Sequence, residues 1–339
     1  MSGAVAAHHE LRLRAGEWVR IRPADAILAT LDERGRLDGL QFMPEMAQYC
    51  GARLRVHKSA HKTCDPLKSG RNVRMERAVH LEGLRCDGQA HGGCEAACLL
   101  FWKEAWLERT APPEASAEGE AAAPSIAPAP SPQARCDAET LMRETQAPPD
   151  GGAVRYVCQA TALLDATTPL HRFDPRPYVR DLLSGNVGPL RFAYFVGLAA
   201  LTRVIRRVTR QPAYPYLPGL AKGKTPTEKL DLQPGELVQV RSRHEIMQTL
   251  DARRRNRGLY FDVEMEPFCG KTLRVQARVR RVIDEHTGRM VTIARDCLIL
   301  EGAACGGCRS VGRLFCPRGI YPFWREIWLR RVAPGTSDP

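Results

Sequence analysis

One stretch of the chain decides the fold because the sequence contains it twice. Residues 16–56 read GEWVRIRPADAILATLDERGRLDGLQFMPEMAQYCGARLRV, and residues 235–275 read GELVQVRSRHEIMQTLDARRRNRGLYFDVEMEPFCGKTLRV. The offset of 219 positions continues without a gap to Cys86, which matches Cys305, and beyond that point the second copy gains three residues. A repeat of this length indicates an internal duplication, so both copies are expected to fold alike. Shared positions include Asp32 and Asp251, Phe42 and Phe261, Glu45 and Glu264, and Trp102 and Trp324.

Each copy has the local pattern of a small strand-rich domain. It begins with an alternating segment, EWVRIR or ELVQVR, that predicts a β-strand, and a short helix follows. In the second copy, Ser242 and Glu245 have the spacing of a capping box at the start of this helix. Residues 274–302 alternate apolar and polar side chains around a Thr-Gly turn, which predicts a β-hairpin. Each copy is therefore predicted to be a short SH3-like barrel decorated by a cysteine loop.

Two tryptophans four residues apart end each copy. This spacing places both rings on one side of the element, where they are expected to cover the metal loop and close the small core. The glutamate between them, Glu104 or Glu326, is expected to pair with arginines of the repeat. The tryptophans are Trp102 and Trp106 in the first copy and Trp324 and Trp328 in the second.

The repeats divide the chain into four parts. The first SH3-like cysteine repeat occupies residues 1–110, and the second occupies residues 231–339. Residues 111–133 are rich in Ala, Pro, Ser and Glu, a composition typical of a disordered linker. Residues 134–230 form a unique, mostly helical segment that includes RFAYFVGLAALTRVIRRVTR, with arginines where the helix dipole favours them. The predicted fold class is α+β: two small SH3-like β-barrel repeats, joined by a disordered linker and a mostly helical insert.

Three motifs resemble those of a known family. The runs LDxxGxxxGLxFxxEMxxYCG, VHLEGLRCDGxAHGGC and FCPRxIYPFWREIWL resemble an uncharacterised bacterial family with duplicated SH3- or KOW-like cysteine-rich repeats. The resemblance covers both repeats and the approach KTPTEKLDLQPGELV, and it covers the unique segment less clearly. It implies a fold and a metal site, and it implies no reaction.

The composition indicates which cellular compartment and which kinds of partner to expect. The chain has 339 residues, 12 cysteines and a formal net charge of +12. Its amino-terminal sequence lacks the apolar region of a signal peptide, and its longest apolar run, residues 192–201, is about half of a membrane span. A cytoplasmic protein with no membrane partner is therefore expected, and reduced thiols there favour metal ligation or catalysis over disulfides. The positive charge suits an acidic partner such as nucleic acid, although a solvated face of arginines gives the same total.

The duplication selects the candidate metal ligands, because cysteines present in both copies serve a shared need. Cys50 and Cys86 flank the predicted hairpin, so antiparallel pairing brings them together, and the other sulfurs are expected to converge there. The fourth ligand in each copy comes from a copy-specific position. The predicted ligands are Cys50, Cys86, Cys94 and Cys98 in the first copy, and Cys269, Cys305, Cys308 and Cys316 in the second.

The remaining cysteines are expected to serve other roles. Cys64 and Cys297 lie on the arms of the predicted hairpins and are expected to be strand cysteines, and Cys297 is an alternative to Cys308 as a ligand. Cys136 lies beside the predicted linker, and Cys158 is expected to be a core thiol.

The metal is inferred from the ligand chemistry. His61, His80 and His91 have no histidine counterparts in the second copy, so histidine ligation is not expected. All-cysteine ligands at irregular spacing, with Pro317 after Cys316, favour a [4Fe–4S] iron–sulfur cluster in each repeat, two per chain. Zinc is the alternative, because the second copy has a C-x₂-C pair and the first has none. Buried reduced thiols and disulfides are the other readings of these cysteines.

The function predicted from these features is a cytoplasmic iron–sulfur protein. It would serve electron transfer or catalysis in a bacterial biosynthetic pathway, with an unknown small-molecule or redox partner. The alternative is a zinc-stabilised tandem SH3-like module that binds nucleic acid or another protein. The sequence contains no P-loop and no G-x-S-x-G or H-E-x-x-H motif. Cys158 and His171 permit nucleophilic catalysis in principle, but their order is a weak signal, so no catalytic residue is assigned.

Overall fold

The structure is a computed structural model that divides into two compact units, each with its own sheet and its own hydrophobic core. It describes residues 11–65, 67–112, 136–150, 152–171, 173–209 and 218–332. Unit 1 comprises Met1–Gly93, Leu99–Gly188 and Asp284–Arg289. Unit 2 comprises Cys94–Cys98, Pro189–Ile283 and Met290–Pro339.

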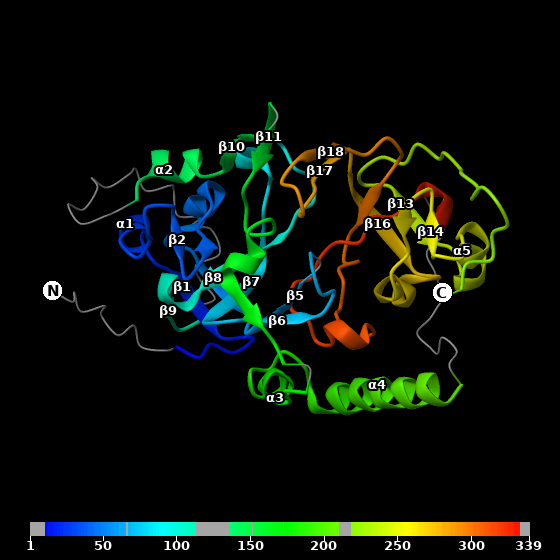
Figure 1. Ribbon diagram of the computed structural model, residues 1–339, viewed down its shortest axis with the longest axis horizontal. Helices are drawn as coiled ribbons and strands as arrows, with labels where there is room; N and C mark the ends of the chain where they lie inside the picture. The colour runs from blue at the N-terminus through cyan, green and yellow to red at the C-terminus, as the bar shows by residue number, and fades with distance from the viewer. Residues whose placement is uncertain are drawn as a thin grey trace. The chain divides into compact units, whose positions relative to one another are not determined.

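Unit 1 is built on a curled antiparallel sheet with the strand order β8-β7-β4-β1-β9, drawn in blue and cyan in Figure 1. Its strands are β1 (Trp18–Ile21), β4 (Arg53–Ser59), β7 (Ala78–Arg85), β8 (Leu99–Lys103) and β9 (Leu107–Arg109). Burial alternates along β1, where Val19 and Ile21 are fully buried, as expected for a strand with one face on the core. The β4–β7 ladder shifts register between Val56 and Lys58, and such a bulge increases the twist of a sheet.

Smaller elements complete unit 1, and the unique segment contributes several of them. The strands β2 (Arg36–Leu37) and β3 (Leu40–Gln41) form one hairpin, and β10 (Gln146–Asp150) and β11 (Ala153–Tyr156) form another. A second sheet has the order β12-β6-β5, from β5 (Lys62–Cys64), β6 (Asn72–Met75) and β12 (Thr167–Pro169). The helices are α1 (Ala24–Leu28), α2 (Ala138–Arg143) and α3 (Arg176–Leu183), with the 3₁₀ helices η1 (Pro44–Tyr49), η2 (Gln89–His91), η3 (Glu104–Trp106) and η4 (Leu163–Ala166).

Unit 2 contains a four-stranded antiparallel sheet with the order β19-β16-β13-β20. Its strands are β13 (Leu237–Val240), β16 (Thr272–Arg278), β19 (Leu298–Leu300) and β20 (Leu329–Arg331). The hairpins are β14 (Arg255–Asn256) with β15 (Leu259–Tyr260), and β17 (Arg281–Ile283) with β18 (Met290–Thr292). The helices are α4 (Pro189–Thr209) and α5 (Arg243–Thr249), with η5 (Val263–Phe268), η6 (Val311–Arg313) and η7 (Glu326–Trp328).

Strand pairing in unit 2 follows that of unit 1 at the sequence offset. Val19 of β1 pairs with Leu54 of β4, and Val238 of β13 pairs with Leu273 of β16. The ladders β4–β7 and β16–β19 also shift register at equivalent positions. The shared sequence pattern is therefore accompanied by the same local register in both units.

Two tryptophans packed on one phenylalanine close each core. In unit 1, Trp102 and Trp106 are fully buried and meet the Phe42 ring edge-on, with centroid separations of 6.2 and 5.2 Å. In unit 2, the two tryptophans lie 6.2 and 5.2 Å from Phe261. The indole N–H of Trp106 donates to the Thr30 hydroxyl at 3.1 Å. The prediction that the tryptophans close the core is confirmed.

A buried glutamate between the tryptophans holds the chain that leads into the first strand. The Glu104 carboxylate accepts the backbone N–H groups of Arg12 and Leu13 at 3.0 and 3.1 Å. The Glu326 carboxylate accepts the backbone N–H groups of residues 230–232 at 2.6 to 3.0 Å. It also accepts from one arginine of the repeat at 3.3 Å, so the expected arginine pairing is confirmed for Glu326. In unit 1, the donors to the Glu104 carboxylate are the backbone N–H groups of Arg12 and Leu13.

A buried ion pair fastens α3 to the rest of unit 1. The Lys62 ammonium on β5 lies 2.9 Å from the Asp181 carboxylate on α3, and both side chains are fully buried. The Asn186 amide donates to the same carboxylate at 3.1 Å and exchanges two hydrogen bonds with the backbone of Ser59. This part of the unique segment is therefore an integral piece of unit 1.

The α+β class is confirmed, as are the capping box at Ser242 and a hairpin around the Thr-Gly turn, now β17 and β18. The unique segment contains strands β10 to β12 as well as helices, and the boundary between the units falls inside it, after Gly188. Apart from its first two residues, the predicted linker 111–133 lies outside the described residues.

Residues 192–201 lie in α4, a continuous helix (Figure 1). Within the described ranges, no helix combines the length and apolar character that a membrane span requires.

Removing the Phe42 ring should destabilise unit 1, because the ring is buried and contacts both tryptophans. Phe42→Ala should lower the free energy of unfolding by about 3–5 kcal/mol, and Phe42→Leu should lower it by about 1.5 kcal/mol or less. Urea unfolding followed by tryptophan fluorescence measures both, with Phe261→Ala as the equivalent change in unit 2. A loss below about 1 kcal/mol for Phe42→Ala would show that the aromatic cluster is not the core.

Candidate metal centre

Three potential metal ligands meet in unit 1: Glu45, Cys86 and His91. Their ligand atoms all lie within 4.8 Å of one another. Cys86 Sγ lies 3.0 Å from Glu45 Oε1, and His91 Nδ1 lies 3.3 Å from the same oxygen. Within the described ranges, His, Cys, Asp and Glu side chains form no other such group of three or more. The group is buried, because the Glu45 and His91 side chains are only 4% and 1% exposed.

Three separate segments position these side chains. Glu45 lies in the first turn of η1, Cys86 directly follows β7, and His91 ends η2. The residue after His91, Gly92, has a φ of 63°, in the left-handed region that favours glycine. A Cβ atom on Gly92 would also press against the end of the Tyr156 side chain, which would have to shift, so both the backbone conformation and the space favour glycine. The glycine-rich sequence after β7 therefore folds back and directs His91 toward η1.

A backbone hydrogen bond sets the state of the His91 ring. Its Nε2 lies 3.1 Å from the Val157 carbonyl oxygen, an acceptor, so Nε2 carries a proton and donates. In the neutral ring, Nδ1 is then an acceptor whose lone pair faces Glu45 Oε1. Two facing acceptors repel unless a proton or a cation lies between them.

Two polar atoms of the group also lack a hydrogen bond. His91 Nδ1 and Glu45 Oε2 are buried, and neither has a partner with hydrogen-bond geometry. Buried polar atoms are nearly always satisfied, and an ion that the structure does not hold is one explanation for an exception. The orphaned atoms thus point to a cation as the missing partner of this group.

The surroundings keep the Glu45 carboxyl ionised. Burial by itself raises the pKa of this group, but the neighbouring His91 ring and the Cys86 thiol bring the pKa of Glu45 below its ordinary value. The Glu45 carboxylate is therefore an anionic ligand in a buried site, and a cation would offset its charge.

The three ligand atoms are an oxygen, a sulfur and a nitrogen. Zinc accepts all three donor types, whereas calcium and magnesium prefer oxygen. Three protein ligands also leave one position of a tetrahedral ion open to water or to another small ligand. The donor set is therefore chemically suited to zinc.

The equivalent carboxylate in unit 2 is satisfied in another way. Glu264, 219 positions after Glu45, accepts the three successive backbone N–H groups of residues 308–310, at 3.1, 2.6 and 2.8 Å. These donors come from the part of the chain where the second copy has its three additional residues. Backbone N–H groups are thus the partners of Glu264 in unit 2, whereas the side chains of Cys86 and His91 are the partners of Glu45 in unit 1.

Cys86 is the one predicted ligand of the first copy that joins this group. Cys50 caps the carboxyl end of η1, where burial raises the pKa of its thiol to about 11. Cys94 accepts a hydrogen bond from the backbone N–H of Ile283 at 3.4 Å, within unit 2. Cys98 is half-buried just before β8. These four sulfurs do not form a group within 4.8 Å, and their shared metal stays a prediction.

Two of the predicted ligands of the second copy influence each other. Burial, followed by the charges of Glu264 and Cys316, raises the pKa of the Cys305 thiol to about 12. Cys308 donates from Sγ to a carbonyl oxygen two residues earlier at 3.2 Å. Cys269 caps η5, and burial raises the pKa of its thiol to about 11. These buried sites favour the neutral thiol in the absence of a metal.

The other four cysteines are buried or half-buried. Cys136 belongs to the core of unit 1, and Cys158 packs against that core, as expected for a core thiol. Cys64 ends strand β5, and Cys297 is 2% exposed in a small apolar cluster of unit 2. No disulfide bond joins any of the twelve cysteines, all of which lie within the described residues.

Sequence reasoning missed two members of the group. Comparison of the copies sets His91 aside, because the second copy has no histidine at the equivalent position. Glu45 and Glu264 are glutamates shared by the two short 3₁₀ segments η1 and η5, and both are buried. A glutamate shared by both copies was the sequence signal that could have revealed this site.

Comparison with known proteins adds no relative: no family model, no curated protein and no solved structure matches the chain. The assignment of the site therefore rests on its own geometry and chemistry.

The raised pKa of Cys305 predicts slow alkylation in the metal-free protein. With a pKa of about 12, about one thiol in 10⁴ is ionised at pH 8, so iodoacetamide should react about 10³-fold more slowly than with an unperturbed thiol. The rate should rise about tenfold per pH unit from pH 7 to 10, because only the thiolate reacts. Peptide mapping by mass spectrometry measures the rate, and the urea-unfolded chain is the control. Equal rates in the folded and unfolded chains at pH 8 would refute the raised pKa.

Proposed function

We propose that the protein binds a divalent metal ion of the zinc class in unit 1, with Glu45, Cys86 and His91 as its protein ligands. The observation that carries this proposal is the buried group itself, in which three different ligand atoms converge within 4.8 Å. The facing lone pairs of Glu45 and His91 support it, because a cation between them turns repulsion into attraction.

The spacing of the ligand atoms supports zinc. Zinc bonds of about 2.0–2.3 Å in tetrahedral geometry separate the ligand atoms by about 3.3–3.8 Å. The separations of 3.0 and 3.3 Å around Glu45 Oε1 are close to this range. The Nε2–H of His91 also donates to a backbone carbonyl, which is the usual arrangement for a histidine that ligates a metal through its other ring nitrogen. Small side-chain movements would complete the site.

The same group argues against an iron–sulfur cluster at this position. A [4Fe–4S] cluster is held by four cysteine thiolates, and the group contains one cysteine. The two clusters predicted from the eight cysteines would require those sulfurs to gather elsewhere in each unit. Zinc in unit 1 is therefore the proposal that the geometry favours.

We further propose that the two units are copies of one SH3-like barrel, of which the first has the metal group. The matching strand registers, the tryptophan pairs on Phe42 and Phe261, and the buried Glu104 and Glu326 support common descent. The two sites diverge at the loop after β7, where unit 2 supplies backbone donors to its glutamate.

Metal titration of the full chain tests the zinc proposal. Protein stripped with a chelator should bind one zinc per chain, as measured by mass spectrometry of metals and by competition with a chromophoric chelator. Cys86→Ser and His91→Ala should each weaken binding at least 100-fold, because each removes one of three protein ligands. Cys305→Ser, the equivalent cysteine change in unit 2, should leave the affinity unchanged. Zinc at 100 times its dissociation constant should stabilise the fold by about 2.7 kcal/mol.

Two outcomes would overturn the zinc proposal. One is a stripped protein that takes up no zinc while it remains folded. The other is a brown protein, purified without oxygen, that contains iron and sulfide and loses them equally in Cys86→Ser and Cys305→Ser. The second result would favour one cluster in each repeat.

A further inference from the structure

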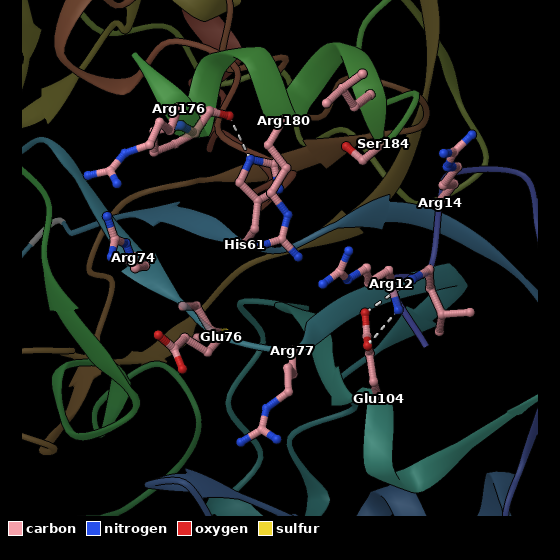
Figure 2. Close-up of a pocket in the computed structure, with 14 residues that line it drawn as sticks. Arg12, Arg14, His61, Arg74, Glu76, Arg77, Glu104, Arg176, Arg180 and Ser184 are labelled. Carbon is pink, nitrogen blue, oxygen red and sulfur yellow. Dashed lines mark hydrogen bonds between the residues drawn. The ribbon is translucent and has the colours of Figure 1, made fainter. Parts of the chain in front are cut away.

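Unit 1 contains an open cavity of about 860 Å³ that is unusually rich in arginine (Figure 2). The volume lies within the range of about 300–1,000 Å³ that is typical of small-molecule sites. The lining includes six arginines and two glutamates. The arginines are Arg12, Arg14, Arg74, Arg77, Arg176 and Arg180.

Ion pairs within the protein account for some of this charge. Arg74 and Arg176 share the Asp174 carboxylate, at 3.0 and 2.9 Å. Arg77 lies 3.4 Å from Asp38. The carboxylates of the described chain form no ion pair with Arg14 or Arg180, whose side chains are exposed. The cavity therefore keeps an excess of positive charge.

Glu104, one of the two lining glutamates, is held by backbone groups. Both of its oxygens are engaged by the backbone N–H groups of Arg12 and Leu13. This contact also fixes the backbone of Arg12 at the cavity wall. In Figure 2 the Arg12 and Arg180 side chains extend toward the middle of the view, from the amino-terminal segment and from α3.

Two of the equivalent positions in unit 2 carry the opposite charge. Asp231 stands in place of Arg12, and Asp296 stands in place of Arg77, both at the offset of 219. The Arg12 and Asp231 positions are structurally equivalent, because the backbone N–H of each donates to the buried glutamate of its own unit at 3.0 Å. Unit 2 has a cavity of only about 260 Å³ next to Asp296. The scaffold of unit 2 thus folds with acids at the positions of Arg12 and Arg77, so this scaffold does not require an arginine at either position.

We propose that the cavity of unit 1 binds a phosphorylated small molecule, whose phosphate group is held by the guanidinium groups of Arg12 and Arg180. The planar guanidinium fork matches two phosphate oxygens, and bonds between two charged groups are the strongest hydrogen bonds that proteins make. Glu76, the second lining glutamate, supplies an acceptor for a hydroxyl group of the ligand. A concave site of this volume fits a nucleotide-sized molecule better than it fits an extended nucleic-acid backbone.

Isothermal titration calorimetry on the full chain tests this proposal. The probes are adenosine 5′-monophosphate and inorganic pyrophosphate, in 0.15 M salt so that non-specific attraction is screened to about 8 Å. We expect at least one probe to bind, and we expect Arg12→Asp and Arg180→Ala each to weaken that binding at least tenfold. Arg12→Asp introduces the residue that unit 2 already carries at this position, so the fold should tolerate it.

Arg253→Asp is the matched control, because it makes the same change of charge on an exposed arginine of unit 2 outside the cavity. It should leave the affinity within twofold of the unchanged protein. The proposal is wrong if neither probe binds at millimolar concentration, or if both cavity variants bind as well as the unchanged protein. It is also wrong if a single-stranded oligonucleotide binds more tightly than both probes and is insensitive to Arg12→Asp and Arg180→Ala.

Discussion

A carboxylate that leaves water must find partners, and this constraint organises both units of the protein. Four glutamates are buried in the described chain: Glu45, Glu104, Glu264 and Glu326. An unpaired buried charge costs several kcal/mol, so each carboxylate must be met by donors or by a cation. Glu104, Glu264 and Glu326 each accept two or three successive backbone N–H groups. Glu45 instead faces a thiol and an imidazole.

Glu45 differs from the other three carboxylates because side chains, and not backbone N–H groups, are its partners. Backbone N–H groups are fixed by the fold, and they satisfy a carboxylate without a further component. A cysteine and a histidine are side chains that also bind transition metals, and their ligand atoms converge on the carboxylate. The buried Glu45 Oε2 and His91 Nδ1 atoms lack hydrogen-bond partners, and a bound cation would provide one. The proposed zinc would therefore satisfy the buried carboxylate of Glu45, as backbone N–H groups satisfy that of Glu264.

The likeness between the sheets and cores of the two units also helps to distinguish residues with structural roles from residues with functional roles. Residues that close the core recur in both units, as the tryptophans on Phe42 and Phe261 do. Residues that differ at equivalent positions are not needed by the fold, and they include both Arg12 and His91. In unit 1, His91 completes the metal group and Arg12 lines the cavity, so each feature includes one such residue.

Much of the scaffold follows from the sequence, because it depends on local patterns. The capping box at Ser242 and the Thr-Gly turn are short-range features, and the structure contains both elements that they predict. The metal group depends on how η1, β7 and η2 meet in space, which residue spacing does not reveal. The criterion that ligands must recur in both copies excluded His91 as a ligand. This criterion fails here because the buried glutamates of the two units have different partners. The cavity depends on α3 of the unique segment, for which the sequence offers no repeat to compare.

X-ray absorption at the zinc edge tests the central claim most directly, because it counts the atoms bound to the metal in the full chain loaded with one zinc. The account predicts a first shell with one sulfur at about 2.3 Å and nitrogen or oxygen atoms at about 2.0–2.2 Å. Cys86→Ser should remove the sulfur from this shell, and Cys305→Ser should leave it in place. A shell of three or four sulfurs would contradict the account, because it would mean that the cysteines gather without Glu45 and His91.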